Sequence, residues 1–188
     1  MIDARLYNEP CCNCLLSLRN WYTPRWGKGR DEIGNSPILF ITDIPGITEY
    51  RSQIHYSGKY TSVLNKFIEQ YKLTEYCVKT HLIKCYNPKA ERKYARKCIH
   101  NIIKDIKETK PIIIISCGKL VYETLTDKEV YNMWSIINKP VRFANSILIP
   151  ILHPSYITRN NKEDEYKTSF TLISDLYARA NSNYALFR

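Results

Sequence analysis

The stretch Ile38-Leu39-Phe40-Ile41-Thr42-Asp43-Ile44-Pro45-Gly46 decides the fold, because a short apolar run ends in a polar turn. Four consecutive apolar residues between two prolines predict a strand that is buried on both faces. Three further runs have the same character, at residues 76–83, 112–115 and 147–149. Strands of this kind are typical of a parallel sheet.

Helical periodicity lies between and after these strands. Apolar side chains recur every three or four residues over 63–71 and over 98–106. A last stripe over 166–177 follows the acidic run 163–165, which suits the positive end of a helix dipole. The alternation predicts one α/β domain over residues 1–188, built as a three-layer α/β/α sandwich around a central, mainly parallel four-stranded sheet.

Unusual polar residues follow each expected strand. The turns carry Thr42 and Asp43, then His81, then Cys117-Gly118, and finally His153-Pro154-Ser155-Tyr156. Ligands of such sheets bind beyond the carboxyl ends of the strands. We therefore expect these residues to share one rim.

The charge of the chain is strongly positive and unevenly placed. There are 28 Lys and Arg against 18 Asp and Glu, and residues 79–110 alone hold ten basic and three acidic side chains. Such a concentration favours a polyanion, with nucleic acid as the leading partner, although a solvated helix face explains the charge about equally well.

No apolar run is long enough to cross a bilayer, and Met1–Leu6 lacks the pattern of a secretory signal. We therefore expect an intracellular, cytoplasmic protein with no membrane association, and no obligatory protein partner is evident. In a reducing compartment, seven cysteines favour metal ligation and core packing over disulfides.

Four of the cysteines lie in contexts that suit a metal centre. Cys11 and Cys14 have a two-residue spacer, Cys85 follows a strand, and Cys98 begins a helical stripe. Four thiolates fit zinc or a [4Fe–4S] cluster. Burial as small hydrophobic residues is the alternative, and it suits Cys77 and Cys117 better.

In its ordered motifs the chain resembles the iron–sulfur (family 4) uracil-DNA glycosylases. That family has a CxxC, an FGEG-like segment, an ILFVGEAPG-like turn, a PFVG-like pocket segment, a strand ending in KC, a helical Cys, a PKVIVxLG-like strand and a closing HPSYLLR. The matching segments here are Cys11/Cys14, WGKG at 26–29, ILFITDIPG at 38–46, HYSG at 55–58, THLIKC at 80–85, Cys98, PIIIISCG at 111–118 and HPSYITR at 153–159.

The resemblance implies a glycosylase fold and a structural [4Fe–4S] cluster held by Cys11, Cys14, Cys85 and Cys98, with segment 1–30 supplying part of it. It also implies a monofunctional DNA glycosylase, which hydrolyses the N-glycosidic bond of a base flipped out of DNA and leaves an abasic site.

The same resemblance assigns the roles of the rim residues. His153 is expected to donate a hydrogen bond to the leaving base, and Asp43 to position the attacking water, with Glu49 as the second choice. Tyr56 is the expected stacking ring. Thr42 and His81 would complete the base pocket.

Contacts to DNA are expected from two turns and one basic region. Pro45, Gly46 and Ser155 would bind phosphates, and Tyr156–Arg159 would form a loop that wedges into the duplex, with Arg159 on the backbone. Further basic contacts near the cluster are expected from Lys84, Lys93 and Arg96.

Three departures from the family pattern change the pocket. Thr42-Asp43 replaces Gly-Glu, Gln53 replaces a Gly, and His81 replaces the Asn that reads uracil. We therefore expect a modified pyrimidine as substrate, such as a substituted cytosine of viral DNA, with a role in antiviral defence. A catalytically silent iron–sulfur nucleic-acid-binding protein and a zinc-binding interaction module are the alternatives.

Overall fold

The computed structural model describes residues 36–86 and 92–185, and their centre is a single sheet. Its strands are β1 (Ile38–Thr42), β2 (Cys77–His81), β3 (Ile113–Cys117), β4 (Val141–Phe143) and β5 (Ser146–Ile151). They lie in the order β2-β1-β3-β5-β4, and every pairing is parallel except that of β4 with β5. The predicted α/β class with a mainly parallel sheet is confirmed, with five strands where four were predicted.

The central strand β1 shows why the sheet is covered on both sides. All five of its residues are buried. Ile38 and Phe40 belong to one hydrophobic core, whereas Leu39 and Ile41 belong to the other. Successive side chains of a strand point to opposite faces, so a continuous apolar run must have a layer on each side.

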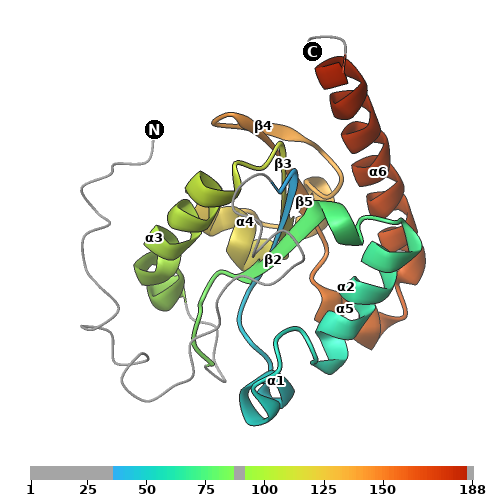
Figure 1. Ribbon diagram of the computed structural model, residues 1–188. Helices are drawn as coiled ribbons and strands as arrows, with labels where there is room; N and C mark the ends of the chain where they lie inside the picture. Colours follow the sequence, from blue (N-terminus) through green and yellow to red (C-terminus); the bar gives the residue numbers. More distant parts are fainter. Residues whose placement is uncertain (1–35, 87–91, 186–188) are drawn as a thin grey trace.

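Helices form those two layers (Figure 1). One face is covered by α2 (Lys59–Gln70), α5 (Pro154–Asn160) and α6 (Glu163–Ala185). The other is covered by α3 (Arg92–Thr109) and α4 (Lys119–Thr126). The three-layer arrangement is therefore confirmed, and the three predicted helical stripes lie in α2, α3 and α6.

Short helical segments connect these elements. Helix α1 (Ile47–Ser52) follows β1, while single turns η4 (Thr74–Tyr76) and η5 (Met133–Ser135) precede β2 and β4. None of the helices in the described part of the chain is both long and apolar enough to cross a membrane.

The strand register places the polar turns at one rim, as predicted. Thr42 at the end of β1 is paired with His81 at the end of β2, and Cys117 of β3 is paired with Ile151 of β5. The turns after these four strands therefore leave the sheet at the same edge.

Candidate active site

Two side chains that were predicted to act in catalysis meet at this rim. His153 Nε2 lies 3.9 Å from Asp43 Oδ2, and both side chains are about one quarter exposed, at 25% and 24%. Asp43 comes from the turn after β1 and His153 from the turn after β5, so residues 110 positions apart are brought together by the sheet. The pair is accessible to a ligand from the rim.

The hydrogen bonds of His153 define the state of its ring. Its Nδ1 accepts the backbone N–H of Ser155 at 3.2 Å and lies 2.8 Å from Ser155 Oγ, because His153 is the N-cap of α5. A nitrogen that accepts an N–H carries no proton in a neutral imidazole. In the neutral ring the proton is therefore on Nε2, which faces Asp43 and can donate into the site.

Asp43 is held in a poorly solvated position. Burial raises the pKa of its carboxyl, and nearby His153 partly offsets this effect. Its Oδ1 is buried and has no hydrogen-bond partner within residues 36–86 and 92–185. Buried polar atoms are nearly always paired in proteins, so this oxygen is well suited to receive a proton from a water or a substrate.

Gly118 at the end of β3 lets the histidine approach the sheet closely. Its φ is +98°, and a Cβ there would lie only 3.0 Å from His153 Cβ. A residue with a side chain would therefore be strained and would push His153 away from Asp43.

A second cluster contains the three residues that were predicted to bind the base. Thr42 Oγ1 lies 2.7 Å from His81 Nδ1 and 3.3 Å from the hydroxyl of Tyr56. The rings of Tyr56 and His81 are stacked, with centroids 4.6 Å apart and an angle of 8°. Thr42, Tyr56 and His81 thus form one closed polar and aromatic group.

This cluster is sealed from solvent. The three residues are at most 2% exposed, so a base can reach them only if the packing around Tyr56 opens. Burial, together with Lys84, His153 and His55, lowers the pKa of His81 well below its ordinary value, and the ring is neutral. Its Nε2 has no hydrogen-bond partner in the described structure.

Glu49, the alternative to Asp43, holds the pocket loops together. Its carboxylate accepts the backbone N–H of Gly46 at 2.6 Å and the hydroxyl of Thr61 at 3.4 Å. It lies 3.8 Å from His81 Nε2, on the pocket side of the rim. Burial raises its pKa, and these hydrogen bonds oppose that rise. Since its oxygens already have donors, the geometry favours Asp43 as the residue that positions water.

The segment Tyr156–Arg159 is not the loop that the sequence suggested. It lies within α5, where Ile157 is buried and the Tyr156 ring packs edge-on against Trp134, with centroids 6.3 Å apart. Arg159 is exposed, but its guanidinium donates to Ser155 Oγ and to the Ser155 carbonyl. His153 as N-cap and Pro154 at the first position make this segment helical.

The other expected phosphate-binding residues differ in accessibility. Ser155 is half-buried beside His153, Gly46 is half-buried as the N-cap of α1, and Pro45 is buried. Lys93 and Arg96 are exposed on α3, where Arg96 lies 3.7 Å from the exposed Asp127.

The expectation that Lys84 contacts DNA is wrong. Its side chain is only 1% exposed, and its ammonium is bonded to Asp105 of α3 and to Thr80 of β2. A buried ammonium is stable only when a carboxylate compensates it, so this pair anchors the turn after β2 to α3. In the sequence, Asp105 is an acidic residue beside the apolar stripe of a basic helix, and this position could have indicated that it pairs with a buried cation.

The expected cluster ligands are only partly covered by the structure. Cys11 and Cys14 lie outside the described residues, whereas Cys85 and Cys98 are buried at 5% and 7% exposure. Within the described ranges, no group of three or more His, Cys, Asp and Glu side chains could hold a metal ion. Cys77 and Cys117 lie in strands, where burial raises the pKa of Cys77 to about 12 and also raises that of Cys117, so both behave as core residues.

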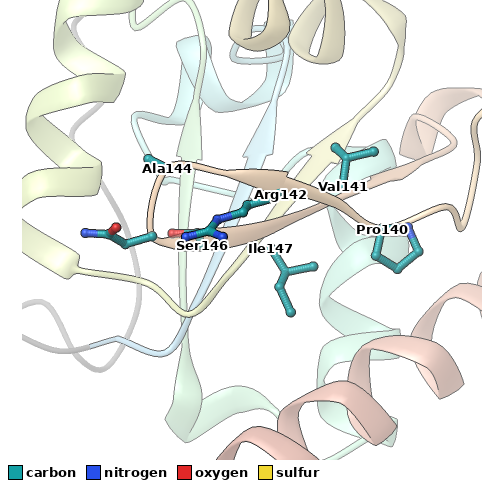
Figure 2. Close-up of a pocket in the computed structure, with 7 residues that line it drawn as sticks. Pro140, Val141, Arg142, Ala144, Ser146 and Ile147 are labelled. Carbon is teal, nitrogen blue, oxygen red and sulfur yellow. The ribbon is translucent and has the colours of Figure 1, made fainter. Parts of the chain in front are cut away.

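A surface hollow at the β4–β5 hairpin is separate from this site (Figure 2). It is lined by Pro140, Val141, Arg142, Ala144, Asn145, Ser146 and Ile147. Ser146 and Ile147 begin β5, and Val141 of β4 is paired with Leu148, whereas His153 lies beyond the carboxyl end of β5, five residues after Leu148. The hollow is therefore not part of the rim.

Comparison with known proteins identifies the family to which this chain belongs. Among solved structures, the chain is similar to wild-type SMUG2 from Pedobacter heparinus, with 14% identity and a TM-score of 0.49 over 79% of this chain and 77% of that one. No curated protein matches the chain. Residues 29–175 match the model of the uracil DNA glycosylase superfamily, from before β1 into α6. Since that match covers most of the chain, including the whole sheet and both halves of the rim pair, the chain belongs to the uracil DNA glycosylase superfamily, whose members are DNA glycosylases.

Proposed function

We propose that this protein is a monofunctional DNA glycosylase that removes an altered pyrimidine flipped out of DNA, with a modified cytosine preferred over uracil. The observation that carries the proposal is the pair Asp43–His153 at the carboxyl rim of the sheet. The pair places the Nε2 of His153, as a hydrogen-bond donor, and the carboxylate of Asp43, with its unpaired Oδ1, within reach of the same nucleotide.

The two side chains match the charges that develop in the reaction. When the C1′–N bond breaks, its electron pair leaves with the base, and the sugar becomes cationic. The Nε2–H of His153 can donate to the oxygen of the departing base. Asp43 can stabilise the cationic sugar and accept a proton from the water whose oxygen bonds to C1′.

The state of His81 supports a substrate other than uracil. An asparagine side chain offers a donor and an acceptor side by side, which can pair with O4 and N3–H of uracil. His81 already uses Nδ1 with Thr42, so only Nε2 remains for a base. With this single hydrogen bond, His81 cannot contact both O4 and N3–H of uracil. Discrimination between bases then depends on the rest of the pocket.

A [4Fe–4S] cluster in the manner of the family 4 enzymes is part of the proposal. Cys85 and Cys98 are buried soft donors from the turn after β2 and from α3, and they would ligate the cluster together with Cys11 and Cys14. A bound cluster would supply structural support to this region rather than chemistry. Anaerobically purified protein should be brown and contain iron and labile sulfide, and Cys85→Ser should lose both while Cys77→Ser keeps them. Stoichiometric zinc without iron would contradict the assignment.

The direct test of the proposal is incubation with duplexes that each carry one uracil, 5-hydroxymethylcytosine or glucosylated 5-hydroxymethylcytosine. We expect alkali-labile abasic sites, formed fastest in a modified-cytosine duplex, and no covalent adduct with borohydride. An adduct would show a lyase mechanism, and cleavage of uracil DNA alone would refute the substrate assignment. DNA binding without abasic sites would instead support a catalytically silent protein. Activity on glucosylated DNA would also support a role against modified viral genomes.

A further inference from the structure

The buried carboxylate of Glu49 faces the unpaired nitrogen of His81. Glu49 Oε1 lies 3.8 Å from His81 Nε2, and both side chains are at most 1% exposed. Within residues 36–86 and 92–185, Nε2 has no hydrogen-bond partner. Buried polar atoms are nearly always paired, so an unpaired nitrogen beside a carboxylate marks a place where a ligand can complete the hydrogen bonds.

One oxygen of Glu49 has room for a further hydrogen bond. Oε2 accepts the backbone N–H of Gly46 at 2.6 Å, which fixes the orientation of the carboxylate. Oε1 lies 3.4 Å from the hydroxyl of Thr61, but that hydroxyl has a single hydrogen and is closer to the Gly58 carbonyl, at 3.0 Å. A carboxylate oxygen can also accept more than one hydrogen bond. Oε1 therefore presents an acceptor to the pocket.

The same carboxylate selects the tautomer of His81. Burial keeps the ring neutral, and its Nδ1 lies 2.7 Å from Thr42 Oγ1. A threonine hydroxyl can donate or accept, so Thr42 is compatible with either tautomer. A carboxylate beside Nε2 favours the proton on that nitrogen, and Thr42 then donates to Nδ1. His81 Nε2–H and Glu49 Oε1 thus form a donor next to an acceptor.

This pair of groups is complementary to cytosine and not to uracil. Cytosine presents the N3 acceptor next to the N4 amino donor, whereas uracil presents the N3–H donor next to the O4 acceptor. Cytosine N3 can accept the Nε2–H of His81 while the amino group donates to Oε1 of Glu49. Uracil in the same position would place N3–H against Nε2–H and O4 against the carboxylate. A base that lies in the plane of the His81 ring is also parallel to Tyr56, whose ring is inclined to it by 8°.

We propose that His81 and Glu49 together bind the Watson–Crick edge of a flipped-out cytosine, a role that rests on the proposed glycosylase function. The two contacts replace the pair that an asparagine makes with uracil by a pair of opposite polarity. A substituent at C5 is compatible with them, because that carbon carries none of the bonded atoms. Glu49 is then a residue that determines specificity rather than one that positions water.

Glu49→Gln should shift the preference from cytosine toward uracil. The amide oxygen can accept the Gly46 N–H, and the amide NH₂ then takes the place of Oε1 as a donor for O4 of uracil. Without the carboxylate, His81 can carry its proton on Nδ1, where Thr42 accepts it, and can offer Nε2 to N3–H. In duplex DNA, the kcat/KM for 5-hydroxymethylcytosine relative to uracil should fall by about ten- to a hundred-fold. An unchanged ratio would overturn the two contacts and leave the proposed function intact.

Glu123→Gln is the matched control. Glu123 is also a buried glutamate whose carboxylate accepts a backbone N–H, that of Val130 at 2.7 Å, but it lies in α4 and has Lys119 as its ionic neighbour. This variant should keep the wild-type ratio between the two bases. Thermal unfolding of both variants shows whether each one is folded under the assay conditions.

A second readout needs neither cleavage nor a Glu49 variant. Nitrogen NMR of histidine-labelled wild type, with the His81 signals assigned from His81→Gln, should show its proton on Nε2. Duplexes with cleavage-resistant 2′-fluoroarabino nucleotides should bind the wild type more tightly with cytosine than with uracil. A proton on Nδ1, or tighter binding of the uracil analogue, would overturn the two contacts. Tighter binding of the cytosine analogue, without base release from any cleavable duplex, would refute the proposed function but not the contacts.

Discussion

The imidazole ring of His153 has two roles: Nδ1 caps α5, and Nε2–H faces Asp43. In His153→Ala both are lost. Removing one donor to charge that exists only in the transition state lowers kcat by about 10²–10³-fold, or roughly 2.7–4 kcal/mol. Losing the cap costs about 1 kcal/mol of folding stability, which for a chain of this size lowers Tm by about 2–4 °C.

His153→Asn distinguishes the two effects. Asparagine is a good N-cap and can accept the N–H of Ser155, but its shorter side chain does not reach the position of Nε2. We therefore expect the full loss of kcat with a Tm close to that of the wild type. Affinity for DNA should change little in either variant, since the donor acts mainly in the transition state.

The assay is single-turnover base release from a duplex, with thermal unfolding and DNA binding measured on the same preparations. Near wild-type kcat in His153→Asn would refute the catalytic role and leave His153 as a cap. A kcat loss in His153→Ala that tracks its loss of stability, and disappears at low temperature, would also contradict the assignment.

Three further predictions concern charged residues. Because burial raises the pKa of Asp43, the acid side of the pH–kcat profile should fall at a higher pH than an ordinary carboxyl would give. Single-turnover rates of Asp43→Asn should be low and should lack this acid limb. An unchanged profile would contradict the catalytic role of Asp43. Lys84→Met removes the ammonium that compensates Asp105, so it should lower the free energy of unfolding in denaturant by about 3–5 kcal/mol. Adding Asp105→Leu should restore much of this loss. A neutral effect of Lys84→Met would argue against the buried pair. Lys93→Gln with Arg96→Gln should reduce the slope of log K against log salt by about 0.9 for each phosphate that the protein no longer neutralises, and an unchanged slope would remove α3 from the DNA surface.

The layers of the fold could be predicted from the sequence because their signals are local. The fully apolar run of β1 requires cover on both faces, and the stripes in α2, α3 and α6 supply it. Strand β4 was missed since it is a three-residue edge strand whose first two residues are exposed, so it has no apolar run to detect.

The rim was predictable for the same reason, since parallel strands place their carboxyl ends together. The state of each side chain was not. Lys84 lies in a basic segment and looks like a surface residue, but its partner Asp105 is 21 positions away in the chain. Tyr156–Arg159 has a β-branched and aromatic sequence, and only the capping geometry of His153 and Pro154 shows that it is helical. Such outcomes depend on tertiary contacts that no local pattern contains.

We propose that the rim pair Asp43–His153 makes this chain a glycosylase for altered pyrimidines. Mass spectrometry of the free base released from a duplex with one 5-hydroxymethylcytosine or its glucosylated form, compared with uracil, tests it most directly. We expect the wild type to release intact modified cytosine into solution, in an amount equal to the abasic sites formed. The rate should exceed that for uracil and should be strongly reduced in His153→Asn. No free base from any of these DNAs, from protein that is folded and bound to them, would contradict it.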